Sequence, residues 1–315
     1  MYVLLLHKYC TSSKFRLLNL ALLTIIPCLL VLNIVYSYQK SVGRPFFGVL
    51  IGGPPYGGSY VDKPTPFYWY GIKDGLRGDD YLAKIDGLPI AHDMKTVQLL
   101  YDWGESEVTL DVEAGTTKRK VKTHLSLMTL THFTDAIMAN VLIVIAGWLI
   151  ALMFYRQSTN LVTELGSLLG AMGSITAITG IPRLSTFGSV DIVFLLFNLL
   201  GGFAQAFIGV FVVHFLWLIL NKNKLSRKTW MILLPLYGFG FVIFIARILS
   251  HIAGQGFENS DQGLLFDQIA YQGEKTILIG VTIASWLLIA YRLYTEKTRK
   301  LQLLFAFWTV GILSS

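Results

Sequence analysis

The stretch FTDAIMANVLIVIAGWLIALMFY, residues 133–155, decides the class of fold. A transmembrane helix needs about 20 mostly apolar residues, and this run is long enough to cross a bilayer. Comparable runs occupy 17–38, 161–180, 190–220, 230–250 and 276–294, and a shorter one occupies 301–315. We therefore predict a polytopic α-helical membrane protein with six complete membrane helices and an incomplete seventh.

The composition of the whole chain supports this class. Hydrophobic residues make up 54% of the 315 residues and charged residues 14%, whereas a soluble domain carries about 25% charged residues. Disorder is excluded by the same numbers, and two cysteines, Cys10 and Cys28, are too few for a disulfide-stapled miniprotein. We attribute the net charge of +7 to basic residues that set the membrane topology, and we expect no nucleic-acid partner.

Basic residues predict the orientation in the membrane. The first run follows Lys8, Lys14 and Arg16, is longer than a signal-peptide core and ends in a poor cleavage site. Residues 1–16 are therefore expected to form a cytoplasmic tail before an uncleaved anchor at 17–38. With this orientation the short outer loops hold only Arg183 and Lys275, in agreement with the positive-inside rule.

Residues 39–132 differ in composition and are predicted to form an extracytoplasmic domain, followed by a membrane bundle over 133–315. The pattern predicts a strand at 81–85, a hairpin turn at Asp86-Gly87 and a helix that begins after Asp93. Strict alternation then predicts a half-buried strand at 107–113, with a return strand at 118–123. Acidic side chains on the outer face of the first strand should lie opposite basic ones on the second.

This order of strand, turn, helix and hairpin resembles a PDZ domain of the bacterial type. The residues that carry the resemblance are Gly75, Leu76, Gly78, Asp79, Leu82, Ile85, Asp86 and Gly87. Such domains bind extended peptides by strand addition. The resemblance implies an upstream groove strand, best matched by Phe46, Phe47, Gly48, Val49, Leu50 and Ile51. The following stretch at 52–58 departs from the family spacing. The expected architecture is thus a membrane bundle with an inserted extracytoplasmic α+β PDZ-like domain.

Four consecutive aromatic residues follow this segment, at Phe67, Tyr68, Trp69 and Tyr70. One interpretation is a hydrophobic ligand pocket. The alternative is that they cover the core of the domain or lie in the membrane surface, where aromatic residues are enriched.

Polar residues inside the predicted membrane helices are functional candidates. Glu164 and His214 are predicted at similar depth and would pair if their helices are neighbours. Asn198 and Gln205 share one helix face, and helix–helix hydrogen bonding is the favoured interpretation. Gly166, Gly170 and Ser174 form a stripe of small residues that favours close helix packing.

No catalytic residue, metal ligand or cofactor is assigned. None of the six histidines is followed by Glu, so the His-Glu-x-x-His helix of a membrane metalloprotease is missing. The chain also lacks a Gly-x-Ser-x-Gly elbow, a Walker-type phosphate loop and zinc-type spacing of Cys and His.

One anchor, an outer PDZ-like domain and a helix bundle together resemble the N-terminal sensor half of bacterial membrane histidine kinases of the competence-pheromone-receptor type. The resemblance is carried by residues 75–90 and their position after the first membrane helix, and more loosely by Val213-His214-Phe215-Leu216 before a basic loop. It implies the bacterial cell membrane, a peptide-like ligand, a homodimer and, only through a kinase module missing from this chain, a response regulator. Because the last apolar run stops at Ser315, we expect a fragment or a truncated product.

The expected function is detection of an extracytoplasmic ligand and transmission to a cytoplasmic kinase output. Membrane lipid is the one partner that the composition itself implies. The first alternative is a PDZ-bearing membrane scaffold, and the second is a transporter with an accessory outer domain. An intramembrane protease is disfavoured by the missing motifs.

Overall fold

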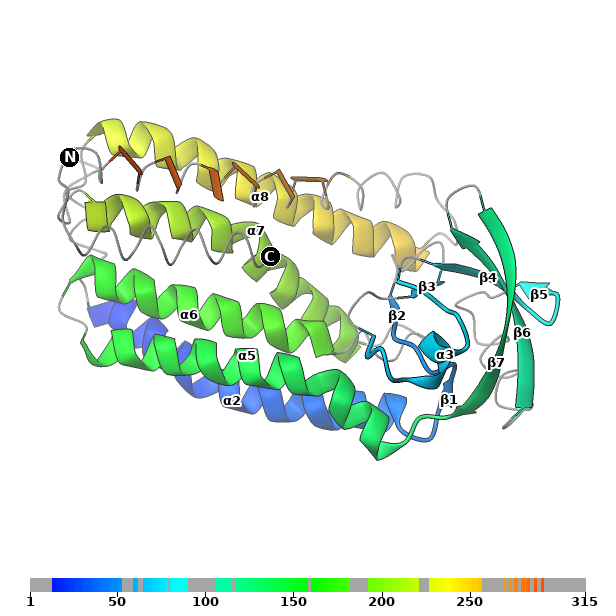
Figure 1. Ribbon diagram of the computed structural model, residues 1–315. Helices are drawn as coiled ribbons and strands as arrows, with labels where there is room; N and C mark the ends of the chain where they lie inside the picture. The colour runs from blue at the N-terminus through cyan, green and yellow to red at the C-terminus, as the bar shows by residue number, and fades with distance from the viewer. Residues whose placement is uncertain are drawn as a thin grey trace.

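The computed structural model describes residues 13–52, 59–61, 65–78, 80–89, 106–114, 117–157, 160–181, 192–220 and 227–256, with single residues and pairs between 269 and 291. These residues form a bundle of long helices with a small sheet domain at one end (Figure 1). The described residues between 269 and 291 are helical, in agreement with the predicted run at 276–294. The predicted run at 301–315 lies outside the described residues.

Five helices of the bundle are long and apolar enough to cross a membrane. They are α2 (Ser13–Ser41), α5 (Leu130–Arg156), α6 (Leu161–Gly180), α7 (Ile192–Leu220) and α8 (Arg227–Gly256). Each coincides with one predicted run, and the bounds of α6 agree with the prediction of 161–180. Together they indicate a multi-pass membrane protein.

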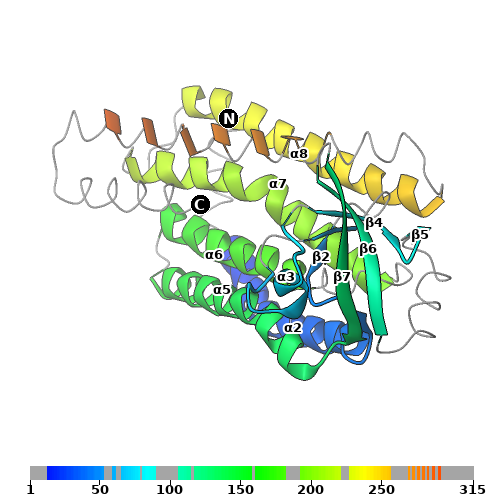
Figure 2. The same ribbon diagram turned by 45° about the vertical axis from the view of Figure 1, so that its right-hand side comes forward.

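The sheet domain lies between α2 and α5 in the chain. Its elements are β1 (Pro45–Phe46), β2 (Ile51–Gly52), β3 (Ser59–Val61), α3 (Tyr70–Lys73), β4 (Tyr81–Ile85), β5 (Leu88–Pro89), β6 (Ser106–Ala114) and β7 (Thr117–Leu127). The strand order is β1-β7-β6-β4-β3-β2, with β5 paired to β4, and every pairing is antiparallel. α3 and β2 lie between the β6–β7 hairpin and the ends of the helices (Figures 1 and 2).

The predicted strands and turn of this domain are confirmed, while the PDZ-like fold is not. β4 occupies 81–85 as predicted, and Asp86 and Gly87 turn the chain into β5 with φ of 47° and 83°. The predicted helix after Asp93 lies outside the described residues. What the described strands establish is therefore a small curled sheet.

The outer face of the β6–β7 hairpin carries the predicted charge pairing. Lys118 lies 2.7 Å from Glu113, and Lys120 lies 4.0 Å from Asp111. The strand register places each acid opposite its base. The inner face holds the apolar core of the domain, which includes Phe47, Leu82, Leu110 and Leu125.

Within the bundle, small residues let α5 and α6 pack closely. A Cβ atom on Gly170 would lie 2.6 Å from the carbonyl oxygen of Gly147, and the hydroxyl of Ser174 donates to the carbonyl of Val144 at 3.1 Å. The stripe of small residues on α6 is thus a packing face, as the sequence indicates.

Candidate functional site: the junction between the sheet domain and the membrane helices

The chain crosses twice between the helices and the sheet, and both crossings are short. α2 ends at Ser41 and β1 begins at Pro45, whereas β7 ends at Leu127 and α5 begins at Leu130. The crossings are hydrogen-bonded to each other: the Gly43 amide donates to the Met128 carbonyl at 2.9 Å, and the Met128 amide donates to the Arg44 carbonyl at 2.8 Å. The sheet is therefore joined to the helices by paired backbone.

A cluster of apolar side chains fills the space beside these crossings. We call it the junction cluster, and its members are Phe46, Leu50, Trp69, Met128, Phe133, Ile137 and Ile181. They come from β1, the segment before α3, the second crossing, α5 and the end of α6. Trp69 is 2% exposed, and its ring meets the Phe46 ring edge-on at 5.1 Å.

Polar contacts at the rim hold the aromatic side chains in place. The Trp69 indole donates to an Asp135 carboxylate oxygen at 3.5 Å. A hydrogen bond between Tyr68 and the same carboxylate raises the pKa of the Tyr68 hydroxyl above 10.0, with burial and the charge of Asp135 adding to the effect. The Tyr70 hydroxyl bonds to the Phe46 carbonyl and lies 2.9 Å from the Ser126 hydroxyl. One residue of α5 and one end of the sheet thus fix three consecutive aromatic side chains.

His132 completes this aromatic set. Its ring lies 5.1 Å from Phe46 and 5.4 Å from Trp69, measured between ring centroids. Its amide donates to the Thr129 side chain, which caps the start of α5. Sequence reasoning tested His132 for metal and catalytic motifs and missed this role in packing. The signal was its position just before the apolar run of α5.

The residues predicted to bind a ligand, 46–51, lie in and beside the junction. Phe47 and Val49 belong to the sheet core, Phe46 and Leu50 to the junction cluster, and Ile51 begins β2. The predicted groove strand is divided into β1 and β2, which lie at opposite ends of the sheet order. Gly48 causes the division, since it adopts a φ of +70° and packs against Gly71 and Tyr70. Nothing tests peptide binding here, and it stays a prediction.

The Gly-Leu and Gly-Asp motif builds a turn that is tied to β7. Gly75 has a φ of +110°, and Leu76, Leu82 and Ile85 are buried in the sheet core. Gly78 lies in the turn, and Asp79 lies outside the described residues. These motif residues shape the domain and leave the question of ligand binding open.

Asp80, which sequence reasoning did not single out, is the buried carboxylate of this turn. It is 2% exposed, accepts from the Arg77 amide at 2.6 Å and pairs with the Arg119 guanidinium. Arg119 also donates to the Gly75 carbonyl at 2.7 Å. The sequence held two signals for this pair. Asp79 and Asp80 are consecutive in the predicted turn, and strand alternation places Arg119 on the inner face while Lys118 and Lys120 lie on the outer face.

The intramembrane polar residues lie on α6 and α7. Nδ1 of His214 on α7 lies 2.9 Å from the Tyr237 hydroxyl on α8, and its Nε2 makes no hydrogen bond within the described residues. This hydrogen bond of His214 is therefore made to α8, and the pairing of Glu164 with His214 stays a prediction. Glu164 is buried on α6, while Asn198 and Gln205 are half-buried on α7.

Two asparagines that sequence reasoning missed join α2 to α6. Asn19 Nδ2 donates to the Glu164 carbonyl at 3.1 Å, and Asn33 Nδ2 donates to the Ile178 carbonyl. Each bond spans 145 residues of sequence, so the two helices are held in one register at both bonds. The signal was the 4-3 spacing of positions 19, 23, 26, 30, 33 and 37 along α2, which share the buried or half-buried face of the helix.

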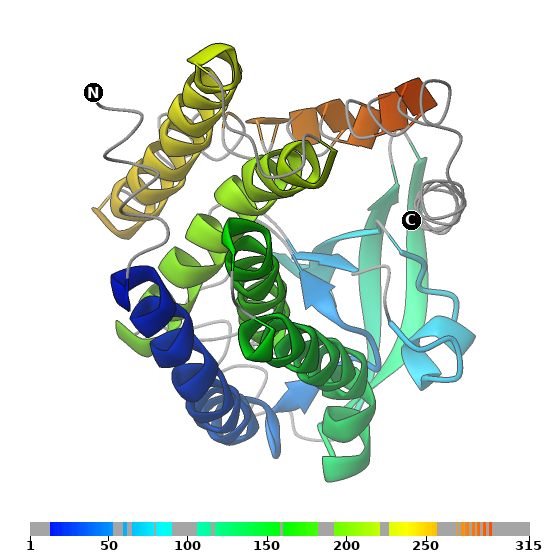
Figure 3. The ribbon, with the colours of Figure 1, turned by 90° about the vertical axis from the view of Figure 1, so that its left-hand side faces the viewer.

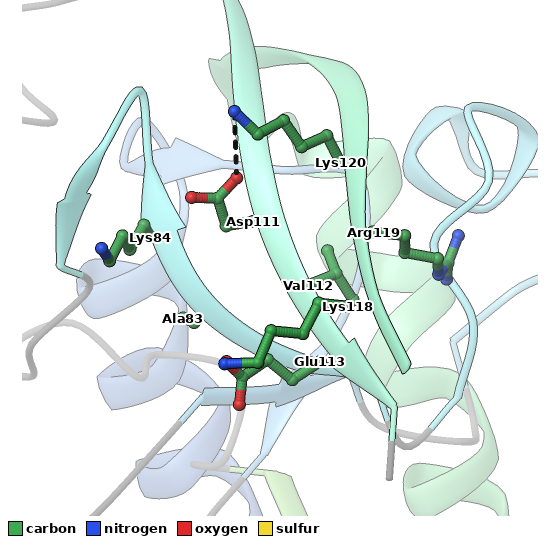
Figure 4. A pocket seen from close by; sticks show the side chains of 8 residues that line it. All are labelled: Ala83, Lys84, Asp111, Val112, Glu113, Lys118, Arg119 and Lys120. Carbon is green, nitrogen blue, oxygen red and sulfur yellow. Dashed lines mark ion pairs between the residues drawn. The ribbon is translucent and has the colours of Figure 1, made fainter. Parts of the chain in front are cut away.

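A shallow depression of about 350 Å³ lies on the outer face of the sheet (Figure 4). Its charged side chains are those of the Asp111–Lys120 and Glu113–Lys118 pairs and Lys84, and Arg119 points away from the two pairs. Among the residues that the structure describes, no group of three or more His, Cys, Asp or Glu could hold a metal ion. The depression is thus a solvated surface, and the junction is the stronger candidate for function.

Comparison with known proteins gives no match: no family model matches the chain, and neither a curated protein nor a solved structure matches it.

Proposed function

We propose that this chain is the sensor part of a membrane receptor, in which the sheet domain binds an extracytoplasmic, peptide-like ligand and transmits the event to the membrane helices. One observation supports this most: the two crossings are hydrogen-bonded to each other beside a packed junction cluster. A domain on flexible linkers moves without disturbing its anchor, whereas a shift of β1 or β7 here displaces α2 or α5.

The mechanism requires two arrangements of the helices with different affinities for ligand. A ligand that binds one arrangement better shifts the population toward it. The junction supplies the physical link, since Trp69 contacts both β1 and α5 through Phe46 and Asp135. In this proposal the output is a histidine kinase module, and the ligand-responsive unit is a homodimer.

Hydrogen exchange on the full chain in nanodiscs tests the proposal. The probe is the peptide fraction of culture medium from the source organism, added to the native protein and to Trp69→Ala. In the native protein, ligand should change amide exchange in β6 and β7 and also in α2 and α5. In Trp69→Ala the change in α2 and α5 should be smaller than in the native protein, because the contact of the junction cluster with Asp135 is lost while the hydrogen-bonded crossings remain.

The matched control is Lys73→Ala, an exposed position on α3 that leaves the junction intact. It should respond as the native protein does. Exchange changes confined to the sheet domain of the native protein would contradict the sensor and favour a scaffold. Stable partners that co-purify without any change in exchange would also favour the scaffold.

A further inference from the structure

The four consecutive aromatic residues at 67–70 separate into two pairs in the structure. Trp69 and Tyr70 point into the junction, where Trp69 is 2% exposed. Phe67 is 82% exposed and Tyr68 is 47% exposed, and their rings contact each other edge-on at 5.6 Å. We expect so exposed an apolar ring, next to a buried aromatic neighbour, to be covered by another apolar surface.

The position of this exposed pair is fixed by α5. The adjoining Trp69 donates to the carboxylate of Asp135, which also raises the pKa of Tyr68 and lies in the second turn of α5. Directly along the helix from Asp135, at spacings of three and four, come the exposed apolar side chains Met138, Leu142, Ile145 and Leu149. In a membrane helix such an exposed apolar stripe faces lipid. The aromatic pair therefore lies at the polar end of a lipid-facing stripe.

The arrangement of the elements leaves room for lipid there. In the view along the bundle, α3 lies on the far side of α5 from α2 (Figure 3), and along the bundle it lies between the helix ends and the β6–β7 hairpin (Figure 1). The exposed pair immediately precedes α3 in the chain. Next to α5 at this height, the neighbouring phase is the boundary between lipid headgroups and acyl chains.

We propose that Phe67 and Tyr68 form a membrane-interface anchor, with the phospholipid leaflet on the side of the sheet domain as the occupant. Aromatic rings are favoured at this boundary because an apolar ring and a polar tip meet two different phases. Phe67 supplies the apolar ring that enters the leaflet. Tyr68 places its ring beside that of Phe67 and carries a polar hydroxyl.

Continuity with the stripe on α5 decides between lipid and a protein partner. A protein partner for Phe67 would also have to cover the adjoining face of α5, where Met138 and Leu142 are more than half exposed. Lipid covers both without any further contact. The anchor contacts the lipid beside α5, and the junction cluster packs against α5 itself. Together they fix the distance of the sheet domain from the membrane. This holds whether or not the domain is a sensor.

Site-directed fluorescence quenching tests the anchor on the full chain. Cys10 and Cys28 are replaced by Ser, and bimane is attached at Phe67→Cys, Lys122→Cys or Leu142→Cys. The vesicles contain phosphatidylcholine and phosphatidylglycerol with nitroxide-labelled lipid, the nitroxide being either on the headgroup or in the acyl chain. Lys122 lies on the exposed face of β7 and serves as the reference for a site in water. Leu142 lies on the lipid-facing stripe and serves as the reference for a site within the acyl chains.

Headgroup nitroxide should cause a larger loss of fluorescence at residue 67 than at residue 122, and acyl-chain nitroxide should act most at residue 142. Equal loss at residues 67 and 122 would overturn the anchor. A bimane at residue 67 that is shielded from both nitroxides and from aqueous iodide would also overturn it, since a protein surface would then be the occupant. Phe67 is 82% exposed, so its replacement removes no core contact and the variant is expected to fold.

Discussion

The sheet domain and the helix bundle expose opposite kinds of side chain. In the sheet domain Leu82 and Leu110 are fully buried, and the outer face carries charges such as Lys118 and Glu113. The bundle has an apolar core too, but it also buries the polar side chains of Asn33 and Ser174 completely, and most of the exposed surface of α2 and α5 is apolar. The difference reflects the surrounding medium, because water drives apolar groups inward whereas lipid gives helices no hydrophobic reason to associate.

The contrast teaches what stabilises each part. The sheet depends on its apolar core and tolerates a buried charge only with a partner, here Arg119 for Asp80. The bundle depends on close backbone approach, as between Gly147 and Gly170, and on hydrogen bonds such as that from Asn33 to α6. Removal of a polar group should thus have unequal consequences in the two regions.

The largest effect is expected for Arg119→Ala. Removal of one partner from a fully buried ion pair leaves an uncompensated charge and costs about 3–5 kcal/mol; here Asp80 is 2% and Arg119 29% exposed, and Asp80 keeps the Arg77 amide, so the loss should lie below that range. The loss should be seen as faster hydrogen exchange of β4, β6 and β7 amides in the full chain, while the amides of α6 are unchanged.

Lys118→Ala, one position away on the exposed face of the same strand, is the matched control for Arg119→Ala. It should leave amide exchange unchanged, because exposed ion pairs contribute little. If Arg119→Ala also leaves amide exchange unchanged, the turn at 75–80 does not depend on its ion pair. The sheet domain and the bundle would then differ less in how they respond to the loss of a polar group.

A smaller effect is expected for Asn33→Ala in the bundle. Interhelical hydrogen bonds in membranes contribute about 0.6–2 kcal/mol, so the variant should unfold at a slightly lower denaturant concentration, with α2 and α6 still in contact. Steric trapping of the full chain in bicelles measures the difference, with Ile25→Ala on the exposed face of α2 as control.

Asn19→Ala in combination with Asn33→Ala sharpens the same point. Because both asparagines hold α2 in one register against α6, disulfide crosslinking between the two helices should lose its preference for one register only in the double variant. A single variant that already loses this preference would show that one bond sets the register alone.

The sequence predicts features that depend on residues close together in the chain, and it does not predict contacts between residues far apart in the chain. The apolar runs predict the five long helices, and the alternation at 107–113 predicts β6 with the register of its charge pairs, because both patterns are local. The junction joins Phe46, Trp69 and Asp135, which local periodicity does not connect. The contact of His214 with Tyr237 was not predicted for the same reason: helix periodicity fixes a face of α7 but does not show that α8 lies against it. Asn19 and Asn33 were hidden because an apolar run identifies a span without showing which side is buried.

The smallest effect concerns Lys118 and its pH dependence. A hydrogen bond to Glu113, and then its charge, raise the pKa of Lys118 above 10.5 against a small opposing effect of desolvation. A raised pKa in the folded state means that the pairing favours folding below the ordinary lysine pKa and that this contribution disappears as the pH rises through the higher folded value. The Lys118 side chain is largely in water and that of Glu113 is half-buried, so salt should weaken the effect. NMR titration of the Lys118 side chain in the full chain should show the raised pKa and its return toward 10.5 in Glu113→Gln. A titration that is the same in Glu113→Gln would mean that the outer face of the sheet carries its charges as independent solvated groups, which would leave the backbone pairing and the apolar core as what holds β6 and β7 together.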